Sequence, residues 1–124
     1  MYSPQVLDHF EHPRNSGVLD HPDASVQLEN PVCGDVLKLS AKVVEGKISE
    51  IKFQAQGCVP AIACGSALSE LVKGMTINQA SALDRSALIP ALGQLPEASS
   101  HALALAMDAV TELLKRLNAI GVSG

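Results

Sequence analysis

Aromatic side chains are scarce in this sequence of 124 residues, which has no Trp, one Tyr and two Phe. The apolar content is nevertheless 47%, as expected of a chain with a globular core. Ala, Leu, Val and Ile must therefore fill that core, and small alanine side chains favour close contacts between helices. The length fits one compact domain, residues 1–124, and leaves little room for a second.

Clusters of basic residues and long apolar runs are also missing. The formal net charge is −4 and no run of Lys or Arg occurs, whereas nucleic-acid binding usually needs a basic patch and often stacking aromatics. No apolar run approaches the roughly 20 residues that span a bilayer, and residues 1–4 lack the basic and apolar regions of a signal peptide. We therefore expect a cytoplasmic protein with no nucleic-acid or membrane partner.

Cysteine occurs only three times, as Cys33, Cys58 and Cys64. An odd number in a cytosolic chain argues against a disulfide framework. Metal binding, thiol chemistry and simple burial as a small hydrophobe remain as alternatives. Ser-His-Asp order, a phosphate-binding loop and paired catalytic carboxylates are not evident, so we do not expect an enzyme.

Two alternating patterns predict the central hairpin. Apolar residues alternate with polar ones over 37–43 and again over 51–55, which is the period of half-buried strands. Residues 45–47 between them, Glu-Gly-Lys, are typical of a turn. A short strand at 26–28 is expected to join this antiparallel sheet.

The rest of the chain shows helical signals, with Ser, Thr, Asp or Pro at expected starts and Gly or Pro at expected ends. The expected helices run from Ser3-Pro4 to His12, from Pro60 to Gly74, after Thr76, between Asp84 and Pro90, and from Pro96 to Gly121. Strands followed by a run of helices predict an α+β fold, a three-stranded antiparallel sheet with helices packed on one face.

Two cysteines stand in segments that suit a metal site. Cys33 lies two residues before Asp35 in a turn tightened by Gly34, so a thiolate and a carboxylate can face one ion. An ordinary turn with a capping Asp and a buried thiol is the alternative. Cys58 stands where a strand gives way to a helix, and a helix N-terminus lowers the pKa of a thiol.

The hairpin relates these segments, because its second strand returns to the end where the first began. Cys33 and Cys58 are therefore expected at the same end of the sheet. Zinc and iron–sulfur centres usually take four ligands at each metal. His101, early in the last helix, is the best candidate for a further ligand, although a single helical His is also a common surface or packing residue.

An ordered set of motifs along most of the chain resembles the IscU/NifU family of iron–sulfur cluster assembly scaffolds. The matching segments are Tyr2-Ser3, His12-Pro13-Arg14-Asn15, Cys33-Gly34-Asp35, Gly57-Cys58, Ala61-Ile62-Ala63, Leu95-Pro96 and His101. The resemblance implies a scaffold that receives sulfur from a cysteine desulfurase, takes up iron and builds a [2Fe–2S] cluster for recipient apo proteins. It also implies Cys33, Asp35, Cys58 and His101 as metal ligands, with zinc at the same site in isolated members.

The chain departs from the family pattern at three places. Ala102 follows His101 where the family has a sulfur-accepting cysteine, and alanine neither carries a persulfide nor binds a metal. Cys64 is an extra cysteine, either a substitute ligand or sulfur acceptor or a buried residue. Residues 95–99, Leu-Pro-Glu-Ala-Ser, lack the second Pro and the Lys with which related scaffolds bind a chaperone, so we do not expect that partner.

Three hypotheses about the function remain open from the sequence. The first is a cluster scaffold or carrier, and a homodimer that shares one cluster belongs to it because each chain lacks one family cysteine. The second is a member that docks on a desulfurase without building clusters. The third is a zinc protein that uses the same ligands.

Overall fold

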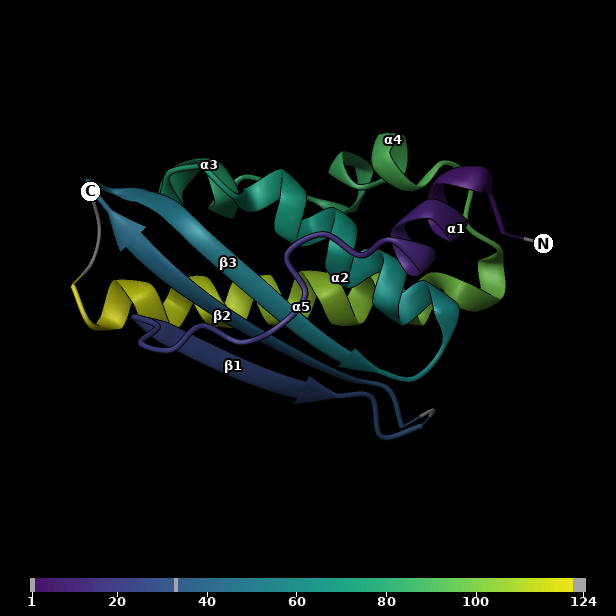
Figure 1. The fold of residues 1–124 in the computed structure, drawn as a ribbon, viewed down its shortest axis with the longest axis horizontal. Helices are drawn as coiled ribbons and strands as arrows, with labels where there is room; N and C mark the ends of the chain where they lie inside the picture. Colours follow the sequence, from purple (N-terminus) through teal and green to yellow (C-terminus); the bar gives the residue numbers. More distant parts are fainter. Residues whose placement is uncertain (1, 33, 122–124) are drawn as a thin grey trace.

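A three-stranded antiparallel sheet forms one layer of the protein, as the sequence predicts. The computed structural model describes residues 2–32 and 34–121. Its strands are β1 (Ala24–Glu29), β2 (Val36–Val44) and β3 (Lys47–Gln56), in the order β1-β2-β3 (Figure 1). Leu37, Leu39 and Ala41 of β2 are buried, as their alternation with polar residues indicates.

A two-residue loop, Glu45–Gly46, closes the hairpin between β2 and β3. Both residues have positive φ values, 53° and 78°, which matches the twist of an antiparallel pair. Lys47 pairs with Val44 and therefore begins β3, although the sequence predicts it as a turn residue. The difference arises because two left-handed residues already reverse the chain.

Helices cover one face of this sheet, which confirms the predicted α+β fold (Figure 1). α2 packs against β3, and α5 packs against β1, β2 and α2. The helical segments are α1 (Pro4–Glu11), α2 (Val59–Val72), α3 (Ile77–Ser81), a 3₁₀ turn η1 (Arg85–Ala87), α4 (Ile89–Leu92), a 3₁₀ turn η2 (Glu97–Ser99) and α5 (Ser100–Ala119).

The ends of several helices follow the predicted signals. Ser3 caps α1 by accepting a hydrogen bond from the Val6 N–H, and Thr76 and Gln79 form a capping box for α3. The one helix expected between Asp84 and Pro90 differs. Asp84 caps only a 3₁₀ turn, and Pro90 lies inside the first turn of α4, where a missing N–H is tolerated.

The last helix begins later than Pro96 predicts. Pro96 precedes the 3₁₀ turn η2, and α5 itself starts at Ser100, since short 3₁₀ turns are frequent at helix N-termini. The predicted apolar stripe is buried along its whole length, comprising Leu103, Ala106, Val110, Leu113, Leu114 and Leu117. Within residues 2–32 and 34–121, no helix has the length and apolar character needed to cross a membrane.

The segment between α1 and β1, residues 12–23, runs along the free edge of β3 and then across the face of the sheet opposite the helices (Figure 1). The Gly17 N–H donates to the Phe53 carbonyl, and the Phe53 N–H donates to the Asn15 carbonyl, both at 2.9 Å. Leu19 lies over Ser40, which is 2% exposed although it points away from the helices. This segment protects an edge that would otherwise present unpaired backbone groups.

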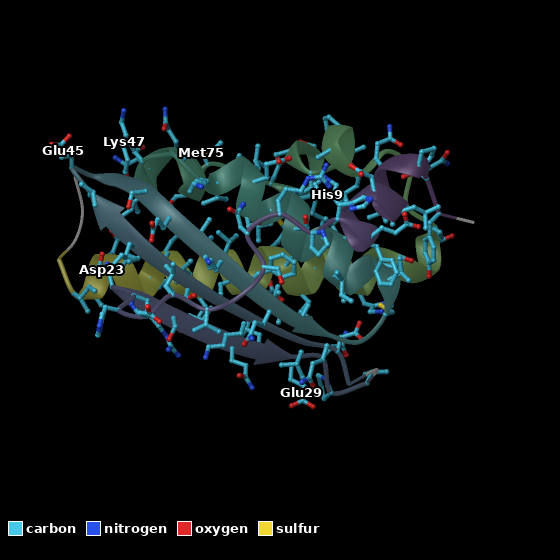
Figure 2. All side chains as sticks on the ribbon, viewed as in Figure 1. His9, Asp23, Glu29, Glu45, Lys47 and Met75 are labelled. Atoms are coloured by element: carbon cyan, nitrogen blue, oxygen red, sulfur yellow. The ribbon has the colours of Figure 1, made fainter. Side chains whose placement is uncertain are left out.

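A buried polar contact joins α1 to α2. His9 is 5% exposed, and its Nδ1 atom lies 2.8 Å from the Ser66 hydroxyl (Figure 2). The Arg14 backbone N–H donates to the same hydroxyl at 2.9 Å. Since Ser66 accepts from Arg14, its own O–H is free to donate to the neutral ring of His9. Burial, and then the charge of Arg14, lower the pKa of His9.

Candidate metal centre

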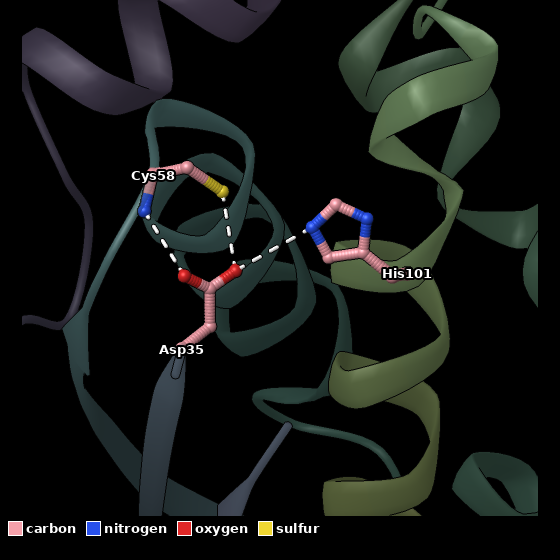
Figure 3. A group of neighbouring side chains, drawn as sticks. All are labelled: Asp35, Cys58 and His101. Carbon is pink, nitrogen blue, oxygen red and sulfur yellow. Dashed lines mark hydrogen bonds and ion pairs between the residues drawn. The ribbon is translucent and has the colours of Figure 1, made fainter. Parts of the chain in front are cut away.

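Three segments that are far apart in the sequence meet at one end of the sheet. Asp35 stands directly before β2, Cys58 is the N-cap of α2, and His101 is the second residue of α5. One ligand atom from each of the three side chains lies within 4.8 Å of the other two (Figure 3). The structure therefore brings together three of the four ligands expected from the sequence.

The Asp35 carboxylate is the centre of this group. Its Oδ1 accepts a hydrogen bond from the Cys58 backbone N–H at 3.3 Å, and its Oδ2 accepts one from the Cys58 thiol at 3.2 Å. The same Oδ2 lies 3.7 Å from Nε2 of His101. Asp35 is only 3% exposed, so these contacts replace most of its hydration.

The separations suit coordination of a single ion. With metal–sulfur bonds of about 2.3 Å and metal–nitrogen or metal–oxygen bonds of about 2.0 Å, neighbouring ligands of a tetrahedral ion lie roughly 3.3–3.7 Å apart. The 3.2 and 3.7 Å separations around Oδ2 of Asp35 are close to this range. Sulfur, oxygen and nitrogen donors together fit zinc or iron better than magnesium or calcium, which prefer oxygen alone.

The pKa of the Cys58 thiol differs in direction from the sequence expectation. The helix N-terminus acts as expected, because a hydrogen bond from the Ala61 backbone lowers this pKa. Burial has a larger effect in the opposite direction, and the Asp35 carboxylate adds to it, so the pKa of Cys58 is raised overall. The sequence pattern reveals the helix terminus but neither the burial nor the neighbouring carboxylate.

Of the other two cysteines, only Cys64 lies among the described residues. Cys33 lies outside the described residues, so its expected place beside Asp35 stays a prediction. Cys64 lies in α2 and is 0% exposed within the core cluster. Burial, with a smaller effect of Cys58, raises the pKa of Cys64 to about 12. This position favours the buried alternative over a ligand or sulfur acceptor.

Ala102 follows His101 on α5 and is 1% exposed. His101 keeps its side chain 38% exposed, so the two neighbours point to different surroundings. His101 also borders a hollow of about 220 Å³ that is lined in part by Glu29, Asn30 and Asp108. No motif in the sequence indicates these residues, although Asp108 follows His101 by seven positions and so shares its side of the helix.

The fold and this group of side chains define a class of protein, namely α+β proteins with a candidate mixed-donor metal centre at one end of an antiparallel sheet. Residues 1–121 match the model of the family described as NifU-like N terminal domain. The chain belongs to this family, as the sequence motifs indicate.

Curated relatives and solved structures agree with this assignment. The iron–sulfur cluster assembly scaffold protein IscU 1 of Archaeoglobus fulgidus is 44% identical over 110 residues, 89% of this chain and 72% of the relative. The scaffold protein IscU of Escherichia coli is 41% identical over 113 residues, 88% of each chain. The crystal structure of a NifU-like N-terminal protein from Brucella abortus superposes with a TM-score of 0.77 at 18% identity, covering 94% of both chains, and shows the same fold.

Proposed function

We propose that this protein is a scaffold or carrier on which iron and sulfide form a [2Fe–2S] cluster for transfer to recipient proteins. The observation that carries the proposal is the convergence of Asp35, Cys58 and His101 within 4.8 Å in a chain of the NifU-like family. The relatives' names, iron–sulfur cluster assembly scaffold proteins, support the same role.

The number and kind of donors support a cluster as the cargo. A [2Fe–2S] cluster is held by four protein ligands, two on each iron, and Cys33 would join Asp35, Cys58 and His101 to make four. Thiolates are the soft ligands that such clusters prefer, whereas a carboxylate oxygen is a harder and weaker ligand for them. A mixed set is therefore suited to releasing a cluster rather than keeping it.

The expected partners are a sulfur donor and proteins that receive the cluster. Sulfur would come from a cysteine desulfurase, and with Ala102 unable to accept it, Cys58 at the site and Cys33, which is expected there, are the candidate acceptors. Recipient apo iron–sulfur proteins would take the finished cluster. The cytoplasm is the proposed compartment, because free thiols stay reduced there.

Anaerobic reconstitution with ferrous iron, cysteine, a cysteine desulfurase and a thiol reductant, which reduces the persulfide sulfur to sulfide, tests this function. We expect visible absorbance of a cluster and equal amounts of iron and acid-labile sulfide in the wild type. Cys33→Ser and Cys58→Ser should abolish both signals, whereas Cys64→Ser, the matched control in the core, should keep them. A wild type that stays colourless and free of iron would contradict the proposal.

The lack of a thiol at position 102 favours a second candidate, a family member that docks on a desulfurase or holds zinc without building clusters. Because residue 102 is 1% exposed and carries no thiol, this position contributes nothing to sulfur transfer. Metal and sulfide analysis of anaerobically purified protein separates the candidates, since zinc without iron or sulfide would favour the second. A radiolabelled persulfide on Cys33 or Cys58 after incubation with desulfurase would favour the first.

A further inference from the structure

Gly57 lies opposite Asp35 at the end of the hairpin. The last paired residues of this end are Val36 and Gln56, so one further step along each chain brings Asp35 and Gly57 face to face. Facing residues of an antiparallel pair normally hold their Cβ atoms about 4.5–5.5 Å apart and share the space between the strands. At this position only one of the two residues has a side chain.

The carboxylate of Asp35 occupies the space that a side chain at residue 57 would need. A Cβ atom added to Gly57 would lie 2.0 Å from Oδ1 of Asp35 and 2.7 Å from its Cγ. It would also lie 3.2 Å from the Asp35 Cα atom, so a new rotamer of Asp35 would not remove every close contact. The carboxylate must therefore turn away if residue 57 gains a side chain.

Turning away separates Asp35 from both of its partners at the site. In the present orientation Oδ1 faces the Cys58 N–H, and Oδ2 faces the Cys58 thiol and Nε2 of His101 (Figure 3). Asp35 is 3% exposed, so the orientation is set by the surrounding atoms rather than by solvent. The missing side chain at residue 57 leaves the space in which this orientation fits.

We propose that Gly57 is a positioning residue, which directs the Asp35 carboxylate toward Cys58 and His101 and thereby completes the metal centre. The inference rests on the proposed function of this site and adds a residue that is not itself a ligand. The simpler role for Gly57 is backbone freedom alone, since its φ is +135°, a value that side chains rarely allow. The experiment must separate these two roles.

Gly74 provides the matched control. Its φ is +91°, and a Cβ atom there would meet nothing within 4 Å. Gly74→Ala therefore introduces backbone strain in a positive-φ position without a side-chain collision, beyond the opposite end of α2 from Cys58. Gly57→Ala introduces both the backbone strain and a collision with the Asp35 side chain.

The probe is Co²⁺, titrated anaerobically into the apo protein against a competing chelator. Loss of a group that orients a metal ligand typically weakens binding about 10–100-fold, and we expect Gly57→Ala to lose affinity in this range. The visible ligand-field bands of its Co²⁺ complex should resemble those of Asp35→Ala, because both variants lack the carboxylate at the metal. Gly74→Ala should bind within about twofold of wild type, with wild-type bands.

A double-mutant cycle between residues 35 and 57 tests the coupling directly. In the Asp35→Ala background the colliding carboxylate is gone, so Gly57→Ala should change Co²⁺ affinity less than about threefold. The same cycle, measured by urea unfolding of the apo proteins, should show that Gly57→Ala lowers the midpoint less when Asp35 is absent. Equal effects in both backgrounds, or wild-type Co²⁺ binding by Gly57→Ala, would overturn the proposal.

Failure of the positioning role and failure of the proposed function give different results. If Gly57→Ala alone does not fold, the double variant with Asp35→Ala must fold, and its failure to do so would overturn the positioning role. If the wild type itself binds no Co²⁺ through thiolate, the proposed function fails, while the unfolding cycle without metal still decides whether Gly57 positions Asp35.

Discussion

At the scale of single residues, Asp35 acts on the Cys58 thiol. The Asp35 carboxylate accepts a hydrogen bond from the Cys58 thiol at 3.2 Å. Burial raises the pKa of Cys58, and this carboxylate raises it further. Because the thiolate is both the metal ligand and the nucleophile, binding of a metal ion must release the thiol proton. A metal ion would therefore replace the hydrogen bond between the Cys58 thiol and the Asp35 carboxylate.

Alkylation of Cys58 as a function of pH measures this control. In a Cys33→Ser background, Asp35→Ala should lower the pH at which alkylation by iodoacetamide reaches half its maximal rate, because the hydrogen bond and the negative charge that raise the pKa are removed. Burial, the largest cause, remains, so the midpoint is not expected to reach that of a fully exposed thiol. Mass spectrometry of the modified peptide gives the rate.

Cys64 is the internal control for that measurement. With no exposed surface and a pKa of about 12, it should stay unmodified in the native protein and react only after unfolding. An unchanged or higher midpoint for Cys58 in the Asp35→Ala variant would contradict the assigned role of the carboxylate.

The hairpin is the element that places the site. Its two-residue loop starts the pairing of β2 with β3, the register shifts between Lys42 and Val43, and the shifted register brings Asp35 next to the Gly57–Cys58 segment. Glu45 holds a φ of 53° in that loop, a conformation that costs most non-glycine residues about 1–2 kcal/mol. Asn tolerates it better, and Asn-Gly is the preferred pair for this kind of turn.

Glu45→Asn should therefore stabilise the protein by about 0.5–1 kcal/mol. Urea unfolding checks the change, with a higher midpoint and an unchanged slope expected. Glu50→Asn is the matched control, because Glu50 is an exposed residue within β3, where Asn is disfavoured. A midpoint that stays the same or falls in Glu45→Asn would show that the loop conformation does not limit stability.

Across the whole molecule, stability is linked to pH through the contact between α1 and α2. Burial first, and then Arg14, lower the pKa of His9 in the folded state. The unfolded chain therefore binds a proton at higher pH than the folded chain does. The contribution of His9 to the free energy of unfolding is therefore fully present above the ordinary histidine pKa of about 6.5. It is lost as the pH falls below this value.

Urea unfolding between about pH 7.5 and pH 5 should show this loss, since most carboxyl groups remain ionised over that window. His9→Gln removes the titrating ring, and its stability should vary less steeply with pH than that of the wild type. Equal slopes in the two proteins would show that His9 does not carry the dependence.

The local sequence determined much of this protein. Alternation specified the strands, Ser3 and the Thr76–Gln79 pair specified helix starts, and the order of Cys, Asp and His motifs indicated the family and three residues of the centre. These features depend on neighbours in the chain, which a sequence displays directly. The exact start of α5 and the turn before Pro90 were not predicted, because 3₁₀ and α turns share the same capping residues.

Only the tertiary structure decided how the site behaves. The direction of the Cys58 pKa depends on burial and on a carboxylate 23 positions away in the chain. The inert place of Cys64 depends on which side of α2 faces the core, and the space left by Gly57 matters only because Asp35 lies across from it. The sequence names the groups of this centre, but desolvation and packing act only between groups that folding has brought together.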